Sequence, residues 1–256
     1  MRQSLWIFRN MYFSAMERAF VHLAVIPGRV KPSDEAEMAT QLLYGELVEI
    51  LEHQKQWRKI KSFADDYTSW VDSKQLTSLD MEPLVWRKDV IRTTSSLSDI
   101  KTKKPHLLPG GSFIHSSIGD FSYSEPSEPN TIREIAMQYI GAPYLWGGKS
   151  VLGIDCSGFM QVVMSGVGQW LPRDAYQQAE VGETVSFVSE AKEGDLAFFD
   201  NGEGKIIHVG IILEESNELN IIHASGEVRI DVLDHQGIFR RDTNSYSHNL
   251  RIIKRI

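Results

Sequence analysis

Short apolar runs, broken by polar residues, dominate the chain between about residues 20 and 78. Four segments, AFVHLAVIPGRV, LLYGELVEILEH, QWRKIKSF and TSWVDSKQL, are rich in β-branched and aromatic residues. Strands this short and this closely spaced are typical of a small β-barrel. The pattern predicts a first barrel over residues 16–79, in which Trp57 and Trp70 supply core or groove surface.

Residues 80–125 repeat this pattern more loosely. Two β-rich segments, EPLVWRKDVIRTT and GGSFIHSSIGDFSY, flank the polar connector SSLSDIKTKKPHLLPGG. We interpret this region as a second small barrel. The next segment, YSEPSEPN at 123–130, is rich in Pro, Ser and Glu, and that composition indicates a linker.

The pattern changes after the linker. Asn130 can cap a helix that ends before Gly141, and a second helix is predicted from about Cys156 to Val167. A loop and a short helix follow in LPRDAYQQAEVG. Strands come next, in DLAFFD, KIIHVGIILEE, ELNIIHAS, EVRID and LRIIKRI. Helices followed by a run of strands predict an α+β domain over 130–256.

The composition is that of a globular protein, with 42% hydrophobic and 24% charged residues. The net charge of −7 has no long run of one sign, which disfavours nucleic acid and anionic membranes as partners. Charges interrupt the apolar N-terminal stretch, which has neither the length of a membrane span nor the pattern of a signal peptide. We therefore expect a cytoplasmic protein. Oligomeric state and the order of residues 1–15 stay open.

A single cysteine, Cys156, lies in the segment GIDCSGFMQ. One thiol excludes an intramolecular disulfide and a CxxC metal site. Asp155 is the type of residue that caps a helix, so Cys156 is predicted in the first turn. There the helix dipole and free N–H groups favour a thiolate, and the backbone N–H of Cys156 can bind an oxyanion. Two interpretations fit: a catalytic nucleophile, or a buried structural cysteine.

Two of the eight histidines, His208 and His223, lie in neighbouring β-rich segments that can form one hairpin. Opposed residues of an antiparallel pair have a constant sum of residue numbers. A four-residue loop, 214–217, places Leu213 opposite Glu218 with a sum of 431, which is also the sum for the two histidines. Side by side on one face, one imidazole can take the thiol proton while the second orients it. A slip of one residue would put them on opposite faces.

A metal site is the alternative for these three residues. Cys156, His208 and His223 can in principle bind zinc, but the spacings typical of zinc sites are missing from the sequence. We expect no metal and no cofactor.

Several motifs follow in order in the second half of the chain: YLWGGKSVLGIDCSGFMQ, LPRDAYQQ, KEGDLAFF, HVGIIL and IIHASG. Over residues 130–256 they resemble the papain-like NlpC family of bacterial cell-wall cysteine peptidases. The earlier segments EMATQLLYGELVEILE, QWRKIKS and DDYTSWV resemble bacterial SH3 domains. The resemblance implies an α+β chain with two small SH3-like barrels, followed by an NlpC-type domain whose antiparallel sheet packs against the nucleophile helix.

The resemblance also implies an activity and its residues. Cys156 would be the nucleophile, His208 the general base and His223 the residue that orients it. The implied enzyme is a thiol protease that cleaves between γ-D-glutamate and a diamino acid in short murein peptides. The resemblance also implies substrate contacts. Tyr144 and Trp146 would line the cleft beside the thiol, and Asp155 and Ser157 would flank the nucleophile. Arg173 and Asp174 would lie along the D-glutamate.

Simpler roles fit some of these residues: core packing for the two aromatics, helix capping for Asp155 and a surface ion pair for Arg173. The sequence departs from the family at Ala175, where relatives often have Ser, so a hydroxyl contact to substrate is missing there.

In the peptidases that the chain resembles, the first barrel closes one end of the cleft and admits a peptide with a free N-terminal L-Ala. An amine needs an acidic or aromatic partner, and Glu35, Glu37 and Tyr67 are the candidates. A cytoplasmic enzyme of this kind fits murein peptide recycling. The alternatives are an amidase or acyl transferase on the same Cys–His scaffold, or a non-catalytic cell-wall-binding protein. The diamino acid, diaminopimelate or lysine, stays open.

Overall fold

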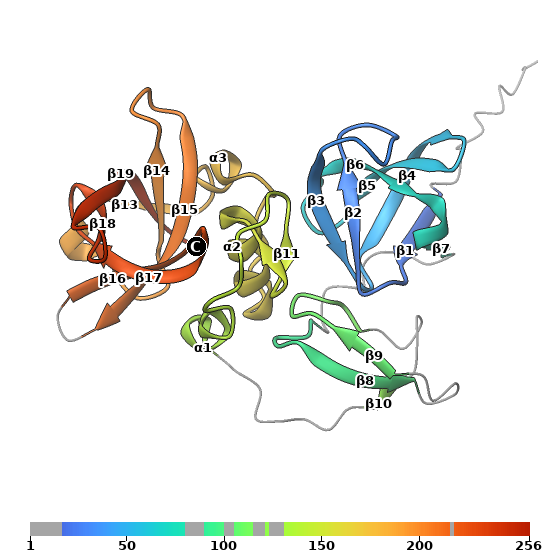
Figure 1. Cartoon of the computed structure of the whole chain (residues 1–256), viewed down its shortest axis with the longest axis horizontal. Helices are drawn as coiled ribbons and strands as arrows, with labels where there is room; N and C mark the ends of the chain where they lie inside the picture. Colours follow the sequence, from blue (N-terminus) through green and yellow to red (C-terminus); the bar gives the residue numbers. More distant parts are fainter. Residues whose placement is uncertain (1–16, 80–89, 100–104, 115–120, 123–130, 216–217) are drawn as a thin grey trace, which may run out of the picture.

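The computed structural model describes residues 17–79, 90–99, 105–114, 121–122, 131–215 and 218–256. Three parts are visible in Figure 1: a barrel of strands β1 to β7, a small sheet of β8 to β10, and a larger domain that begins at helix α1. Within the larger domain, helix α2 lies between the seven-stranded sheet and the first barrel. The α+β fold predicted from the sequence is confirmed.

The first barrel forms where the sequence predicts short strands. Its antiparallel strands follow the order β3-β2-β6-β5-β4-β1-β7, and Trp57 and Trp70 are both buried, as predicted. Gly45 makes the tight turn between β3 and β4 at a φ of +78°, which favours glycine. The strands are β1 Arg18–Val21, β2 Val25–Arg29, β3 Met38–Leu43, β4 Leu47–Gln54, β5 Trp57–Ser62, β6 Thr68–Asp72 and β7 Leu76–Ser78, with a single-turn 3₁₀ helix at Ser73–Gln75.

The region predicted as a second barrel contains a three-stranded antiparallel sheet among its described residues. Strand β8 (Ser95–Asp99) lies between β10 (Phe121–Ser122) and β9 (Pro105–Leu108). Both β8 and β9 fall in the segment predicted as a polar connector, so that prediction was wrong. Burial explains the difference, because Leu97 of β8 and Leu108 of β9 are both buried in one apolar cluster. The predicted linker at 123–130 lies outside the described residues.

The larger domain consists of short helices followed by a sheet. Its sheet order is β13-β19-β14-β15-β16-β17-β18, and β18 also pairs with β19, which closes six strands into a ring. The elements are α1 Ile132–Met137, β11 Lys149–Ser150, β12 Gly153–Ile154, α2 Cys156–Gly166, α3 Ala175–Gln178, β13 Glu183–Val185, a 3₁₀ turn Val188–Glu190, β14 Leu196–Asp200, β15 Ile206–Glu215, β16 Glu218–Ser225, β17 Glu227–Leu233, β18 Gly237–Arg240 and β19 Ser245–Arg255.

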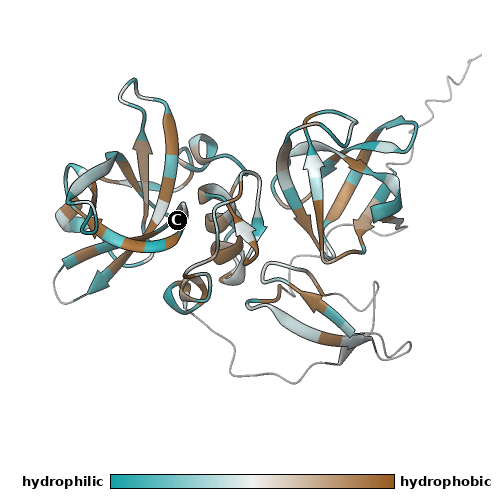
Figure 2. Cartoon of the chain, viewed as in Figure 1, coloured by the Kyte–Doolittle hydropathy of each residue, from teal (hydrophilic) through white to brown (hydrophobic). Residues whose placement is uncertain are grey.

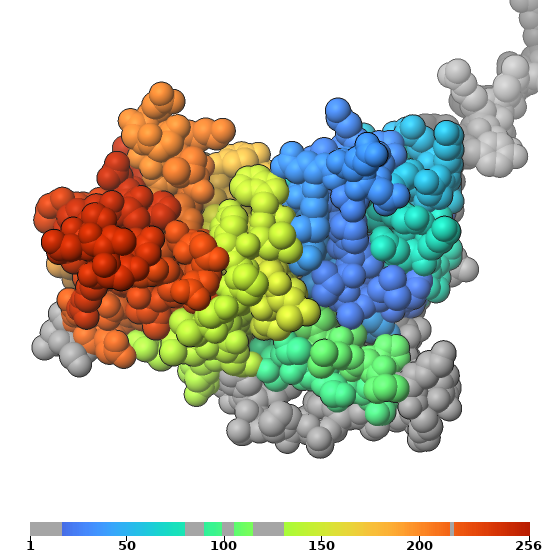
Figure 3. Space-filling model, in the orientation of Figure 1, coloured from blue at the N-terminus to red at the C-terminus, as the bar shows by residue number. Residues whose placement is uncertain are grey.

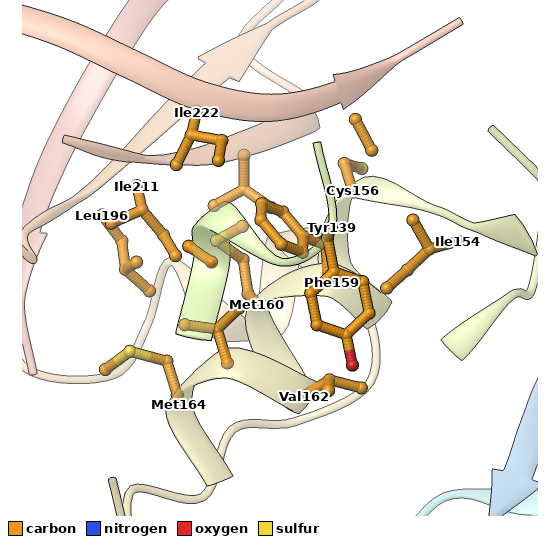
Figure 4. Close-up of a cluster of buried hydrophobic side chains, with 14 of the residues drawn as sticks. Tyr139, Ile154, Cys156, Phe159, Met160, Val162, Met164, Leu196, Ile211 and Ile222 are labelled. Atoms are coloured by element: carbon orange, nitrogen blue, oxygen red, sulfur yellow. The ribbon is translucent and has the colours of Figure 1, made fainter. Parts of the chain in front are cut away.

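Helix α2 is buried along its whole length, and all its residues from Cys156 to Gly166 are inaccessible or nearly so. Apolar residues are concentrated in this helix and along the strands of the sheet (Figure 2). Phe159, Met160 and Met164 pack with Leu196, Ile211 and Ile222 of the sheet (Figure 4). Cys156 lies at the edge of this cluster. The predicted packing of the sheet against this helix is therefore confirmed.

The caps of the two main helices follow local sequence signals. Helix α2 begins after Asp155, as predicted, and the Asp155 carboxylate accepts a hydrogen bond from the Gly158 N–H at 2.7 Å. Helix α1 is capped by Thr131 rather than by Asn130, because Thr131 and Glu134 form a reciprocal capping box. Among the described residues, no helix has both the length and the apolar character needed to cross a bilayer.

Candidate active site

Cys156 occupies the first turn of α2, with its sulfur against the sheet. The backbone N–H groups of Ser157 and Val209 donate hydrogen bonds to the sulfur. Val209 directly follows His208 on β15, so the thiol lies beside the backbone that carries the first candidate imidazole. The sequence-based expectation that a helix start and a strand would bring these segments together is met by this contact.

The charge state of the thiol differs from the expectation. Burial raises the pKa of Cys156 to about 12, and the nearby Asp155 carboxylate adds to the shift. The Arg173 guanidinium and the two N–H donors oppose these effects but do not reverse them. A helix start favours a thiolate only where the sulfur is also solvated or paired with a cation. In the unliganded protein the thiol therefore keeps its proton.

The two histidines are in direct contact, although their predicted register was wrong. His223 pairs with Gly210, not with His208, because the turn is two residues shorter than predicted and Glu215 faces Glu218. The register differs by an even number, so both side chains stay on the same face of the sheet. His208 Nε2 lies 2.8 Å from His223 Nδ1, and both rings are buried.

His208 is enclosed by other rings. The His248 ring stacks on it with a centroid separation of 4.2 Å and an interplanar angle of 21°, and Phe199 lies opposite it on β14. Burial, together with repulsion from His223 and His248, holds the pKa of His208 well below its ordinary value. Burial likewise lowers the pKa of His248 to about 4. His208 is therefore neutral at physiological pH and has a lone pair that can accept a proton.

An acidic residue that the sequence analysis did not single out completes this arrangement. Asp231 on β17 is buried, and its Oδ2 lies 3.0 Å from His223 Nε2. Arg229 donates to the same carboxylate, from Nε to Oδ2 at 2.7 Å and from Nη2 to Oδ1 at 2.9 Å. The sequence did contain a signal for this pair. Arg229 and Asp231 carry opposite charges and are two residues apart in a strand, so their side chains lie on the same face of the sheet. His248 was also missed, because it meets His208 only in the folded sheet, where β14 lies between β19 and β15.

Arg173 is almost fully buried and bonds to the residues around the nucleophile. Its guanidinium pairs with both oxygens of Asp155, and Nη1 donates to Ser157 Oγ at 2.8 Å. Its Nε donates to Thr40 Oγ1 of the first barrel at 2.9 Å. The Asp155 carboxylate thus holds Arg173 and the start of α2 together. The substrate contacts suggested for Asp155, Ser157 and Arg173 stay predictions, because the hydrogen bonds that these side chains make are to other groups of the protein.

Some of the residues predicted to bind substrate lie where the larger domain meets the barrel. Trp146 Nε1 donates to Glu37 Oε1 at 2.7 Å, although the Trp146 side chain is largely exposed. Burial and the neighbouring charge of Asp174 raise the pKa of Tyr67. Burial also raises the pKa of Tyr144 to about 12, and the charges of Cys156 and Asp155 add to this shift.

Not every candidate joins this group. Glu35 lies in a turn of the barrel where its backbone N–H donates to Ser33 Oγ. Ala175, the position of the departure from the family pattern, begins α3 and is buried. Within the described ranges, no cluster of three or more His, Cys, Asp or Glu side chains is arranged to bind a metal ion.

Comparison with known proteins agrees with this geometry. The sequence pattern of the NlpC/P60 family matches residues 141–246. The sequence pattern of the bacterial dipeptidyl-peptidase Sh3 domain matches residues 28–76. Residues 141–246 form an NlpC/P60 domain. The NlpC/P60 domain thus contains Cys156, His208, His223 and Asp231.

Relatives align over most of the chain. Gamma-D-glutamyl-L-lysine dipeptidyl-peptidase of Bacillus subtilis is 28% identical over 204 residues, which span 67% of this chain and 68% of that protein. Dipeptidyl-peptidase 6 of Lysinibacillus sphaericus is 25% identical over 83% of this chain and 90% of its own length. The crystal structure of an NlpC/P60 family protein from Bacillus cereus has a TM-score of 0.72 at 20% identity, covering 93% of this chain and 99% of that chain.

The NlpC/P60 domain and the first barrel share a buried polar interface. Lys149 Nζ donates to Glu46 Oε1 at 2.9 Å, with both side chains buried, and the Lys149 N–H donates to Gln41 Oε1. Gly147, at a φ of +80°, passes so close to the barrel that a Cβ there would lie 2.6 Å from the carbonyl oxygen of Met38. Figure 3 shows the segment around residues 140–160 in contact with the barrel on one side and with the sheet on the other.

Proposed function

We propose that this chain is a cysteine endopeptidase that cleaves short murein peptides with a free N-terminal L-Ala at the bond between γ-D-glutamate and the diamino acid. The observation that carries the proposal is the contact of the lone thiol with the strand that bears His208, backed by His223. The names of the relatives, gamma-D-glutamyl-L-lysine dipeptidyl-peptidases, support the substrate class.

Catalysis begins when a substrate carbonyl approaches Cys156. The thiol proton moves to His208 Nδ1, the ring nitrogen that makes no hydrogen bond with His223. The sulfur attacks the γ-carbonyl carbon of D-glutamate. Because burial disfavours both the thiolate and the imidazolium, proton transfer and attack occur together, with His208 as general base. The backbone N–H of Cys156, in the first turn of α2, and the Tyr144 hydroxyl are donors for the oxyanion.

The tetrahedral intermediate then collapses. The C–N bond breaks, and the imidazolium of His208 gives its proton to the amine of the departing diamino acid. Water, deprotonated by the same imidazole, hydrolyses the thioester, and the thiol is restored when the proton returns to sulfur. The sum of the steps is one peptide plus one water giving L-Ala-D-Glu plus the free diamino acid.

The barrel provides the specificity in this proposal. In this proposal Glu37, which accepts a hydrogen bond from Trp146, and Tyr67 offer an acidic and an aromatic partner for the α-ammonium group of L-Ala. A wall at this position admits a free N-terminus and excludes a longer peptide. Such an enzyme acts on released murein peptides rather than on intact wall, and we place it in murein recycling in the cytoplasm.

The test uses synthetic L-Ala-γ-D-Glu tripeptides that end in meso-diaminopimelate or in L-lysine. Wild-type protein should release L-Ala-D-Glu from at least one of them, and Cys156→Ala should lose several orders of magnitude in turnover while its circular dichroism spectrum is unchanged. An α-linked tripeptide and an N-acetylated one are the controls and should resist cleavage. Absence of the dipeptide product from a correctly folded, reduced wild-type sample would refute the proposal.

A further inference from the structure

Three buried side chains form a hydrogen-bonded relay across three adjacent strands. His208 of β15 lies 2.8 Å from His223 of β16, and His223 lies 3.0 Å from Asp231 of β17. Residues 221–225 of β16 pair with 227–231 of β17, so His223 and Asp231 share one face of the sheet. The relay therefore runs across the strands and ends at a carboxylate away from the thiol.

The carboxylate at the end of the relay is ionised. Although burial opposes ionisation, hydrogen bonds from His223 and Arg229 hold the pKa of Asp231 below its ordinary value. An ionised carboxylate only accepts hydrogen bonds. His223 Nε2 must therefore carry the hydrogen in its contact with Asp231.

This assignment fixes the remaining hydrogens. Burial lowers the pKa of His223, so its ring is neutral and has one N–H only. With that hydrogen on Nε2, His223 Nδ1 is an acceptor, and His208 Nε2 must donate to it. His208 is neutral as well, so its own lone pair is left on Nδ1.

We propose that Asp231 is a positioning residue that sets the tautomers of both histidines and so keeps the lone pair of His208 Nδ1 available to the thiol. The catalytic part of this inference rests on the proposed function. When His208 accepts the thiol proton, its Nε2–H and the His223 ring transmit part of the positive charge toward Asp231. The negative charge of Asp231 then also stabilises the His208 imidazolium, although Asp231 does not contact the substrate.

The tautomers can be measured without substrate. Two-bond ¹⁵N–¹H correlation spectra of the unliganded protein should show His223 and His208 each protonated at Nε2. Asp231→Asn places an amide that both donates and accepts next to His223, and the single tautomer should be lost. A His223 ring protonated at Nδ1 in the wild type, or unchanged tautomers in Asp231→Asn, would overturn the inference.

The kinetic test separates positioning from folding. Asp231→Asn should lower kcat/KM by about 10- to 100-fold, as loss of an outer hydrogen-bonding partner commonly does. Asp242→Asn is the matched control, because Asp242 also pairs with Arg229 but is half exposed and does not contact His223. It should change kcat/KM by less than about 2-fold. In a His223→Asn background, Asp231→Asn should also cost less than about 2-fold, since no tautomer is left to set.

The pH profile gives an independent readout. The titratable and charged groups around the two imidazoles are Cys156 on α2, Arg229 and Asp231 on β17, Arg240 on β18, Asp242 after it and His248 on β19. Asp231 raises the pKa of His223 against the effect of burial, so removing its charge should move the acid limb of kcat/KM to lower pH. An unmoved limb, or equal losses from Asp231→Asn in both backgrounds, would contradict the inference. Wild-type protein that cleaves no tripeptide would instead refute the proposed function, and the spectra would still test the tautomers.

Discussion

Arg173→Met is the substitution whose effect on stability follows most directly from the structure. Arg173 is 2% exposed, and its guanidinium pairs with Asp155, which caps the helix that begins at Cys156. Methionine retains the apolar stem but removes the charge. The Asp155 carboxylate then stays buried without a cation, and its partners are the N–H groups of Gly147 and Gly158 and the hydroxyl of Ser157.

The magnitude follows from the burial of the pair. Breaking a buried ion pair by removing one partner costs about 3–5 kcal/mol, because the remaining charge is left without compensation. With a urea m value of about 3 kcal/mol per M, this loss lowers the urea midpoint by about 1–1.7 M. Arg241→Met is the matched control. Its ion pair with Glu218 is exposed, at 68% and 50% of the two side chains, and should contribute less than about 1 kcal/mol.

Urea titrations followed by intrinsic fluorescence and by far-UV circular dichroism measure both variants. A third variant, Arg173→Met with Asp155→Asn, removes the uncompensated charge while Asn still accepts from the Gly158 N–H. It should recover at least half of the lost free energy of unfolding. Equal midpoints for Arg173→Met and Arg241→Met would refute the reasoning that burial decides the contribution of this pair.

Two further predictions concern the barrel contact and the stacked ring. Gly147→Ala should lower the thermal midpoint more than Gly141→Ala: both glycines have a φ of +80°, but only at Gly147 would the Cβ meet a carbonyl, 2.6 Å away on Met38. Equal decreases in differential scanning fluorimetry would mean that backbone strain alone, about 1–2 kcal/mol, explains both. His248, with a pKa of about 4 in the folded protein and about 6.5 when unfolded, binds its proton first in the unfolded state, so stability should fall as pH drops from 6.5 to 4. His248→Gln should flatten that slope in urea titrations across this range, and an unchanged slope would count against the lowered pKa.

Local signals made the elements around the nucleophile predictable. Asp155 before an apolar helical pattern fixed the start of α2, and the end of the helix at Gly166 lies within one residue of the prediction. The strands of the barrel were also predictable, because short β-rich runs are separated by polar residues in this part of the sequence. Cys156, His208 and His223 could be selected because thiols and imidazoles are few in the chain.

Non-local contacts account for what the sequence analysis missed. The register of the β15–β16 hairpin depends on the length of its turn, and the residues from 214 to 217 carry no signal that distinguishes a two-residue from a four-residue loop. The role of Asp231 depends on a strand pairing outside that hairpin. From the sequence alone, Arg173 was expected to form an ion pair at the surface. Its burial depends on two partners, Asp155 in the same domain and Thr40 in the first barrel. The raised pKa of Cys156 likewise comes from tertiary burial, which a helix-start argument does not include.

The buried bonds between Lys149 and Glu46, and between Arg173 and Thr40, have a consequence for how such chains can diversify. An exchange of the barrel for an unrelated module would leave one ammonium group without its carboxylate and one guanidinium without its hydroxyl. Arg173 contacts Asp155 and Ser157 on either side of the nucleophile, and Lys149 pairs with Ile154, two residues before it. The barrel is therefore inherited together with the chemistry, and its surface can change freely only where it does not meet these two cations.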